Sequence, residues 1–458
     1  MVLKKIHNSA MFKNVAPVYR RSLIFSIGDA FTFSMMMAFG ESFIVPLALY
    51  LGFSGAEIGI ITGLPIFCGA VLQVFSGVFL NFFKTRKRVL LIMIFIQASS
   101  MLMFPLILVL KLKSVIIFTS LAVVYWGFSL AMSPIWASWM NDLTKNISKG
   151  VYFSRRVQIS NFALFISMIP AGFFLKYMDL NNHIVAGFCT LFIIASLSRF
   201  GSWIFIFMKH EPVMEHGTGT DPVQFIKGAS AVFKSSKANV LFFLVFFNFG
   251  VFAAAPFFAP YMLNKLNFGY EKYIIIQSLA IIGKLIFLPA WGFIMEHYGT
   301  RKPLILSSVL AILLPVLWIF SSNFWYLCAI NILTGLVWAG FELSSLNMLM
   351  NNYSSKETLL AWSWYNTLNG FGQVTSSGIS GRLQTAGIFN YNIVFLVSSG
   401  IRMLAVLLLA KKIMEYRVYP KIKYYQLFLR VISVRSNMRP VVIADDNSDE
   451  SSENEASA

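Results

Sequence analysis

Charged residues are scarce in this sequence, and their scarcity excludes an ordinary soluble protein. Only 12% of the 458 residues are charged, whereas soluble domains usually carry about 25%. Hydrophobic residues make up 57% of the chain, and the mean hydropathy is +0.70. A single aqueous core cannot cover that much apolar surface, but a lipid bilayer accepts it. The composition therefore predicts a membrane protein.

Cysteines and histidines are also few, and no motif for metal, redox or nucleotide chemistry is present. Cys68, Cys189 and Cys328 stand singly inside apolar runs, without a C-x-x-C pair. The five histidines lie in or near loops without an H-E-x-x-H motif, which disfavours a membrane-embedded enzyme. The absence of a G-x-x-x-x-G-K-[ST] loop disfavours an ATP-driven pump. We therefore predict no enzymatic activity, no metal and no cofactor.

The formal charge of +18 has two readings, because nucleic-acid-binding proteins are also strongly basic. Here the basic residues form short clusters between apolar runs of about 20 residues, the pattern of a membrane protein with positive cytoplasmic loops. We therefore predict no nucleic-acid partner.

About twelve apolar runs are long enough for a bilayer core, which requires about 20 residues per helix. The first six lie at residues 23–50, 57–81, 88–110, 115–140, 157–178 and 184–208. The second six lie at residues 239–262, 273–295, 303–321, 324–350, 360–382 and 391–411. No small-residue cleavage site ends the first run, so we expect an uncleaved span. The pattern predicts an all-α membrane protein.

Basic residues gather at alternate loops and set the orientation. They precede span one and follow spans two, four, eight and twelve, at Lys4, Lys5, Lys13, Arg20, Arg21, Lys84, Arg86, Lys87, Arg88, Lys145, Lys149, Arg155, Arg156, Arg301, Lys302, Lys411 and Lys412. The loops between them hold far fewer. By the positive-inside rule, both termini are expected in the cytoplasm of a multi-pass inner-membrane protein.

The same pattern divides the chain into five parts. These are a basic cytoplasmic N-terminus (1–22), a six-helix bundle (23–208), a cytoplasmic linker (209–238), a second six-helix bundle (239–412) and a cytoplasmic tail (413–458).

Two short amphipathic helices are expected outside the spans. In the linker, Asp221 reads as an N-cap before Pro222, and Phe225, Ala229, Val232 and Phe233 follow at helical spacing. After Pro420, one face would hold Ile422, Tyr425, Leu429 and Ile432. We expect both helices to lie on the inner leaflet. The acidic, serine-rich residues 445–458 are expected to be disordered.

The two halves of the chain resemble each other. A short loop after span two and its counterpart after span eight share residue types at the same offsets: Gly77, Asn81, Arg86 and Lys87 in the first, and Gly292, Glu296, Arg301 and Lys302 in the second. Spans one and seven share a Phe-Gly pair six residues before a proline, and spans six and twelve share Arg199 and Arg402. Three matches in the same order indicate a duplication.

Both copies of the loop resemble the G-x-x-x-D-x-x-G-x-R-[KR] motif of the major facilitator superfamily. The resemblance implies two six-helix bundles that rock around a central site, with cytoplasmic loops that form a charged latch. The first copy departs from the motif, with Asn81 in place of aspartate and Lys84 in place of glycine. Its acid could come from Asp142 after span four. Only Pro170-Ala-Gly172 remains of the motif of drug antiporters, which argues against that function.

Charges inside the spans that the other half lacks are the candidates for a site. Glu41 stands opposite Val251, Lys284 opposite Gly69, and Glu342 near Ser129. Because an ionised group in a bilayer usually faces a cavity or a partner, we expect Glu41, Lys284 and Glu342 to border the central cavity. The carboxylates would carry protons, and Lys284 would pair with a carboxylate or attract an anion. The alternative is an interhelical salt bridge.

Other intramembrane polar residues have two readings each. Span eleven presents Asn366, Asn369, Gln373, Ser377 and Ser380 on one face, as a cavity wall or as helix–helix hydrogen bonds. The matched Arg199 and Arg402 are expected to brace loops or reach the interface, and Asp29 to be a polar group near the end of its span.

Together these features predict a secondary active transporter, coupled to protons, that moves a small solute by alternating access. We expect a monomer surrounded by lipid. The alternatives are a lipid flippase of the same fold and a membrane sensor that transports nothing.

Overall fold

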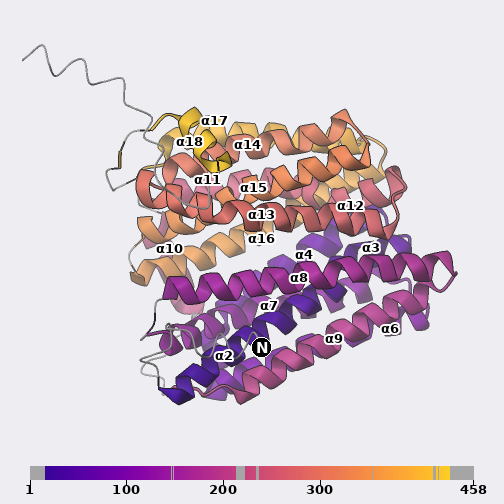
Figure 1. The fold of residues 1–458 in the computed structure, drawn as a ribbon, viewed down its shortest axis with the longest axis horizontal. Coiled ribbons are helices and arrows are strands. Elements are labelled where there is room, and N and C mark those ends of the chain that lie inside the picture. Colours follow the sequence, from indigo (N-terminus) through magenta and orange to yellow (C-terminus); the bar gives the residue numbers. More distant parts are fainter. Residues whose placement is uncertain are drawn as a thin grey trace, which may run out of the picture.

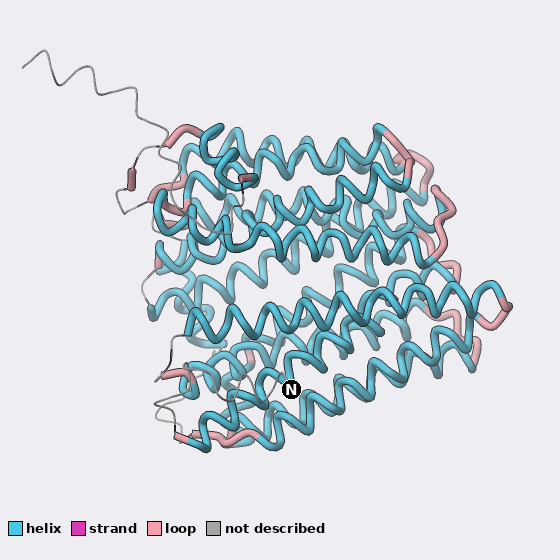
Figure 2. Tube along the Cα trace, viewed as in Figure 1, coloured by secondary structure: helices cyan, strands magenta, loops and turns pink. Residues whose placement is uncertain are grey.

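The computed structural model describes residues 16–145, 147, 149–212, 222–233, 237–353, 355–415, 419–420 and 422–433. Every regular element in this part of the chain is helical. Figure 1 shows the elements of the first half, in indigo to magenta, on one side of the molecule and those of the second half, in orange to yellow, on the other. The helices run side by side, and most of the loops gather at their two ends (Figure 2).

The first half holds six spanning segments. They are α2 (Pro17–Met36) with η2 (Met37–Glu41) and α3 (Ser42–Tyr50), α4 (Gly55–Val74) with α5 (Ser76–Phe83), α6 (Arg86–Val109), α7 (Val115–Leu143), α8 (Lys149–Leu180) and α9 (Ile184–Met208).

The second half repeats this order. It holds α11 (Ala238–Ala254) with η3 (Ala255–Phe257), α12 (Phe258–Pro260) and η4 (Tyr261–Lys265), then α13 (Tyr270–Tyr298), α14 (Arg301–Phe320), α15 (Phe324–Asn352), α16 (Ser355–Thr385) and α17 (Tyr391–Leu409) with η5 (Ala410–Lys412). The linker holds α10 (Pro222–Phe233), and the tail holds α18 (Tyr424–Ile432).

Eleven of the twelve predicted spans coincide with helices that are long and apolar enough to cross a membrane, in the part of the chain that the structure describes. The twelfth, 360–382, lies in the 31-residue α16, which is not among those eleven. Its stripe of amide and hydroxyl side chains lowers its hydropathy. The all-α fold in two six-helix bundles is confirmed.

Spans one and seven both lose regular α-helical geometry near a proline. The π-helical turn η2 ends at Glu41, five residues before Pro46, and η3 contains Pro256. A proline inside a helix removes one backbone donor and clashes with the preceding turn, so the hydrogen bonding shifts locally. These irregular turns carry Glu41 and Ala255, which line the same cavity.

The bundles meet along two helix pairs, α4 with α16 and α8 with α13. Glycines permit the first contact: a Cβ on Gly59 would lie 2.4 Å from the Ser377 carbonyl oxygen, and one on Gly63 would lie 2.7 Å from the Val374 Cα. Small residues let membrane helices approach this closely.

Contacts between the bundles close the end of the molecule away from the basic loops. The Ala56 amide donates to Thr385 Oγ1 at 3.0 Å, and Lys176 Nζ pairs with Glu271 Oε1 at 3.0 Å. These residues lie at the ends of α4, α16, α8 and α13 that are opposite Arg86 and Arg301.

The linker helix does not match the expectation of an apolar face in lipid. Phe225 and Val232 of α10 are buried, and the Phe225 ring stacks on Trp364 of α16 at 4.1 Å between centroids. Trp364 Nε1 also donates to the Phe225 carbonyl at 3.2 Å. The apolar face of α10 therefore packs on the second bundle. The expected N-cap, Asp221, lies outside the described residues.

The tail helix presents two apolar faces. Leu427 and Val431 are buried against the second bundle, whereas Tyr425, Leu429 and Ile432 are about half exposed. The predicted face is thus the one that remains free for the leaflet, with the exception of Ile422, which is buried. The predicted disordered end, 445–458, and most of the basic N-terminus lie outside the described residues.

Candidate functional site

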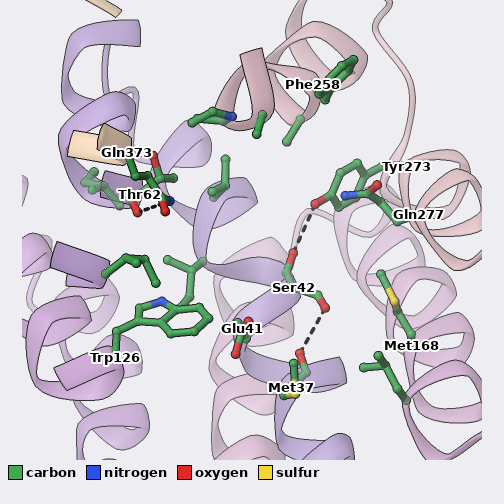
Figure 3. A pocket seen from close by; sticks show the side chains of 18 of the residues that line it. Met37, Glu41, Ser42, Thr62, Trp126, Met168, Phe258, Tyr273, Gln277 and Gln373 are labelled. Carbon is green, nitrogen blue, oxygen red and sulfur yellow. Dashed lines mark hydrogen bonds between the residues drawn. The ribbon is translucent and has the colours of Figure 1, made fainter. Parts of the chain in front are cut away.

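A cavity of about 520 Å³ lies between the two bundles. Its polar wall residues come from both halves and are Glu41, Ser42, Thr62, Tyr273, Gln277 and Gln373. Trp126 and Phe258 add aromatic surface. Figure 3 shows Glu41 and Trp126 on one wall and Tyr273 and Gln277 on the other. This central cavity has the size and mixed lining of a small-molecule site.

Glu41 is the acidic residue of this cavity wall. Its Oε2 accepts a hydrogen bond from the hydroxyl of the fully buried Tyr125 at 2.5 Å. No ion pair with Glu41 is found among the residues that the structure describes. The carboxyl group is half-buried and lines the cavity, so a solute or a proton can reach it from there. The sequence prediction for its position therefore agrees with the geometry, and Tyr125 is a partner that the pattern did not reveal.

Lys284 and Glu342 lie elsewhere. They form a salt bridge with each other between α13 and α15, with side chains 33% and 53% exposed. Neither lines the central cavity; Glu342 instead lines another cavity, of about 420 Å³, with Asn248, Trp338 and Tyr365. Their predicted place on the central cavity is therefore wrong. The mutual pairing is the interhelical salt bridge that was the alternative.

The polar stripe of α16 mainly bonds to other helices. Asn366 Nδ2 donates to Gln73 Oε1 of α4 at 3.1 Å, and Gln373 Nε2 donates to the Thr62 carbonyl at 3.0 Å. Asn369 accepts from Asn248 of α11 at 3.3 Å. Within the stripe, Gln373 also lines the central cavity, whereas Asn366 and Asn369 do not.

The matched arginines are buried inside their bundles rather than placed at the membrane interface. Arg199 is 3% exposed and Arg402 is 2% exposed. Arg199 belongs to a continuous network: its Nε donates to Gln97 at 2.7 Å, and its Nη1 donates to Ser202, which donates to Asp29 at 2.5 Å. Asp29 is therefore a buried network residue rather than a group at the end of its span.

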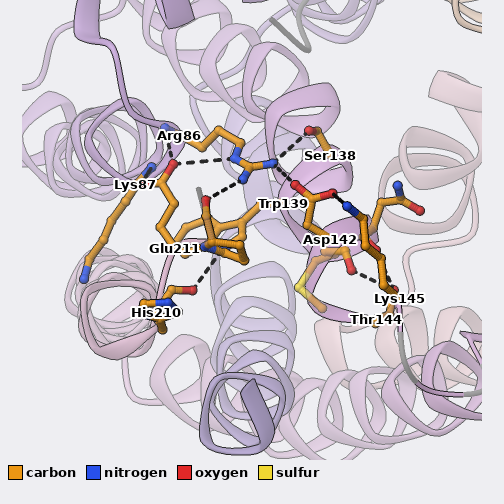
Figure 4. Close-up of polar contacts among 12 residues, drawn as sticks. Arg86, Lys87, Ser138, Trp139, Asp142, Thr144, Lys145, His210 and Glu211 are labelled. Atoms are coloured by element: carbon orange, nitrogen blue, oxygen red, sulfur yellow. Dashed lines mark hydrogen bonds and ion pairs between the residues drawn. The ribbon is translucent and has the colours of Figure 1, made fainter. Parts of the chain in front are cut away.

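A cluster of charges holds the loop between α5 and α6 (Figure 4). Arg86 Nη1 contacts Asp142 Oδ2 at 2.6 Å, which brings together the two residues expected to form the latch. The sequence pattern did not reveal Glu211, whose Oε1 accepts a hydrogen bond from the Arg86 amide at 2.7 Å, at the start of α6. A carboxylate there satisfies free amides and suits the helix dipole.

The second copy of the loop is built differently from the prediction. Glu296 is exposed and makes no ion pair within the described part of the chain, and Asn81 is likewise exposed. Glu415 instead accepts from the amides of Thr300, at 2.5 Å, and Arg301, at 3.3 Å. Each half therefore uses a glutamate from beyond its last span to cap its third span.

The remaining loop residues anchor backbone. Lys87 Nζ donates to the Lys209 carbonyl at 3.1 Å, and Lys302 Nζ donates to the Ile422 carbonyl at 3.0 Å.

Gly77 is buried, but a Cβ on Gly292 would meet nothing closer than 4.0 Å, so close helix packing does not explain that glycine. Lys84 adopts φ of +63°, as Gly299 does at +82°, although glycine is the residue that tolerates this region.

No cluster of three or more histidine, cysteine or acidic side chains suited to a metal ion occurs within the described ranges. The polar and aromatic groups that line the central cavity are carboxyl, amide, hydroxyl, indole and phenyl groups.

Residues 240–424 match the sequence model of a family described as Major Facilitator Superfamily. The chain therefore resembles that superfamily over its second bundle. A mutant of the nucleoside transporter NupG is similar to it with a TM-score of 0.70 and 15% identity, over 86% of this chain and 100% of that one. The xylose transporter XylE from E. coli, in a partially occluded inward-open conformation, gives a TM-score of 0.63 and 10% identity over 89% and 100%.

The E. coli fucose:proton symporter FucP gives a TM-score of 0.59 and 11% identity, over 87% of this chain and 100% of that one. At these identities the likeness establishes the fold alone. No curated protein sequence matches the chain.

Proposed function

We propose that the protein is a secondary active transporter that carries a small polar solute by alternating access and couples this movement to protons through Glu41. The observation that carries the proposal is the central cavity between the bundles, whose wall holds a carboxyl group without a cationic partner in the described structure. A solute bound there contacts both halves, so their relative movement can expose it to either side of the membrane.

Three features support this proposal. The family model that matches residues 240–424 is described as Major Facilitator Superfamily. The similar structures include a nucleoside transporter, a xylose transporter and a fucose:proton symporter. The cavity volume of about 520 Å³ fits solutes of that size. The basic loops at one end of the bundle favour an inner-membrane orientation with cytoplasmic termini.

Transport in proteoliposomes tests the proposal. Uptake of labelled nucleosides, sugars and small carboxylates is measured with and without an imposed pH gradient. For a transported solute, we expect the gradient to raise accumulation in the wild type. In Glu41→Gln, accumulation should fall at least about tenfold, because an amide cannot load and release a proton. Exchange of solute at equal concentrations should persist in this variant.

Glu57→Gln is the matched control, because Glu57 caps α4 away from the central cavity and glutamine also fits a capping box. It should behave as the wild type. Gradient-driven accumulation that survives in Glu41→Gln would reject Glu41 as the proton carrier. Absence of uptake for every class of solute would reject transport itself.

A further inference from the structure

A second cavity, of about 260 Å³, lies inside the C-terminal bundle and adjoins the central cavity, since Ala255, Phe258 and Gln277 line both. Its other polar wall residues are Asn331, Thr334 and Arg402, and Trp318 and Trp338 provide aromatic walls. A solute in the central cavity could therefore extend a small group into this side cavity.

Arg402 is the cation of the side cavity, and no carboxylate neutralises its charge in the part of the chain that the structure describes. Its side chain is 2% exposed, and Nη1 donates to the Ala311 carbonyl at 2.7 Å. Its Nε has no hydrogen-bond partner, and no carboxylate pairs with the guanidinium among the described residues. Lys284, the other basic residue of the second half expected to act in the site, is already paired with Glu342.

In the first half, the charge of the matched arginine, Arg199, is neutralised within the bundle. Arg199 reaches the carboxylate of Asp29 through Ser202, and its Nε is occupied by Gln97. The duplication places Asn239 opposite Asp29, and Asn239 donates to the Lys412 carbonyl instead. The second half therefore retains the buried guanidinium, lacks the corresponding acid and has a cavity beside it.

A buried ion without a counter-charge is far more costly than a paired one, so a ligand that supplies the charge would bind favourably. The wall also offers amide groups: Asn331 Nδ2 uses one hydrogen for the Leu327 carbonyl and has a second available. Guanidinium and amide donors together suit a carboxylate or another small oxyanion.

Resting on the transport function proposed above, we infer that the transported solute is a small organic anion whose carboxylate or similar group binds Arg402 in the side cavity. The remainder of the solute occupies the central cavity beside Glu41. Glu41 in its protonated form adds no repulsion to this anion, so anion and proton would travel together.

Thermal unfolding of the purified protein, followed by tryptophan fluorescence, tests the site without relying on transport. Sodium acetate and sodium benzoate are titrated in sodium HEPES at constant ionic strength, with acetamide, benzamide and sodium chloride in parallel. We expect the carboxylates, but not the amides, to raise the unfolding midpoint saturably. The apparent affinity should fall at least about tenfold in Arg402→Gln and less in Arg402→Lys.

Arg199→Lys is the matched control and should keep the wild-type response. If Arg402→Gln does not fold, Asn331→Leu provides a second test and should weaken the response while leaving the buried cation in place. A carboxylate response that is unchanged in the Arg402 and Asn331 variants, no response in the wild type, or a response to chloride alone would overturn the inference.

The two proposals can fail separately. Uptake restricted to neutral solutes would overturn the anion inference and leave transport intact. Arg402-dependent carboxylate binding without uptake of any solute would support the site and contradict the transport function.

Discussion

At the scale of single residues, the charges near the membrane are neutralised in different ways. Arg86 is paired with Asp142, and Arg199 reaches Asp29 through a serine, but Lys209 has no such partner in the described structure. Lys209 is 1% exposed, and its Nζ lies 5.2 Å from the Trp139 ring centroid. Burial lowers the pKa of Lys209 to about 8, whereas the charge of Asp29 acts in the opposite direction.

Replacement of Lys209 by methionine should therefore stabilise the protein at pH 7. The pKa of Lys209 in the folded protein is below its usual value. The folded protein therefore loses this proton near pH 8, whereas the unfolded chain loses it only near pH 10.5. Wild-type stability should rise with pH between about 8 and 10.5. This lowering of the Lys209 pKa means that the buried charge reduces the free energy of unfolding by about 3 kcal/mol at pH 7. Attraction of the ammonium group to the Trp139 ring makes the reduction smaller.

Unfolding midpoints of the wild type and Lys209→Met, measured from pH 6.5 to 9.5, check this. Lys87→Met is the control, because Lys87 is only partly buried. The difference in unfolding midpoint between Lys209→Met and the wild type should become smaller above pH 8. An advantage independent of pH would show that charge burial is not its cause.

Asymmetry between the halves marked one residue of the central cavity correctly but misplaced Lys284 and Glu342. Glu41 was found in this way, because Val251 stands opposite it. The pairing of Lys284 with Glu342 depends on how α13 packs on α15, and the sequence spacing does not report this. Glu211 and Glu415 follow Arg199 and Arg402 by 12 and 13 residues, so a longer alignment of the halves could have found them.

At the scale of elements, α4 and α16 show what the polar stripe does. The stripe binds α4 through side-chain hydrogen bonds to its backbone, including Ser377 Oγ to the Gly59 carbonyl at 2.8 Å. The sequence predicted the stripe but left cavity wall and helix contact open, because periodicity identifies a face without naming what covers it. Such bonds require the close approach that glycine permits.

Gly59→Ala should therefore separate these helices. Its Cβ would lie 2.4 Å from the Ser377 carbonyl oxygen, so either helix must move, at a cost of about 1–3 kcal/mol. We expect a lower unfolding midpoint in detergent. Gly378→Ala, on α16 itself, is the matched control, because a Cβ there meets nothing within 4 Å and should be neutral or slightly stabilising. Equal midpoints for the two variants would contradict the contact.

At the scale of the whole molecule, the two bundles are joined at the end away from the basic loops, and few polar contacts hold that end closed. The Lys176–Glu271 pair bridges α8 and α13, with side chains 42% and 10% exposed, and Tyr273 donates to the Ser42 carbonyl nearby at 3.4 Å. The transport function proposed above requires such contacts to break in each cycle, so their strength sets the balance between the two conformations.

Glu271→Gln should shift this balance towards the conformation that is open at this end. A partly exposed ion pair contributes about 1 kcal/mol, which corresponds to roughly a fivefold change in the equilibrium. The measurement is the labelling rate, by a membrane-impermeant maleimide, of a cysteine introduced at Ile61 in the central cavity of a cysteine-free protein. The reagent is applied from the side opposite the basic loops, and we expect labelling to be about fivefold faster in the variant.

The exchanged pair, Lys176→Glu with Glu271→Lys, restores opposite charges across the same helices and should return labelling towards the wild-type rate. If the exchanged pair labels as fast as Glu271→Gln, the ion pair does not hold the bundles together and the glycine contacts of α4 with α16 must close this end alone.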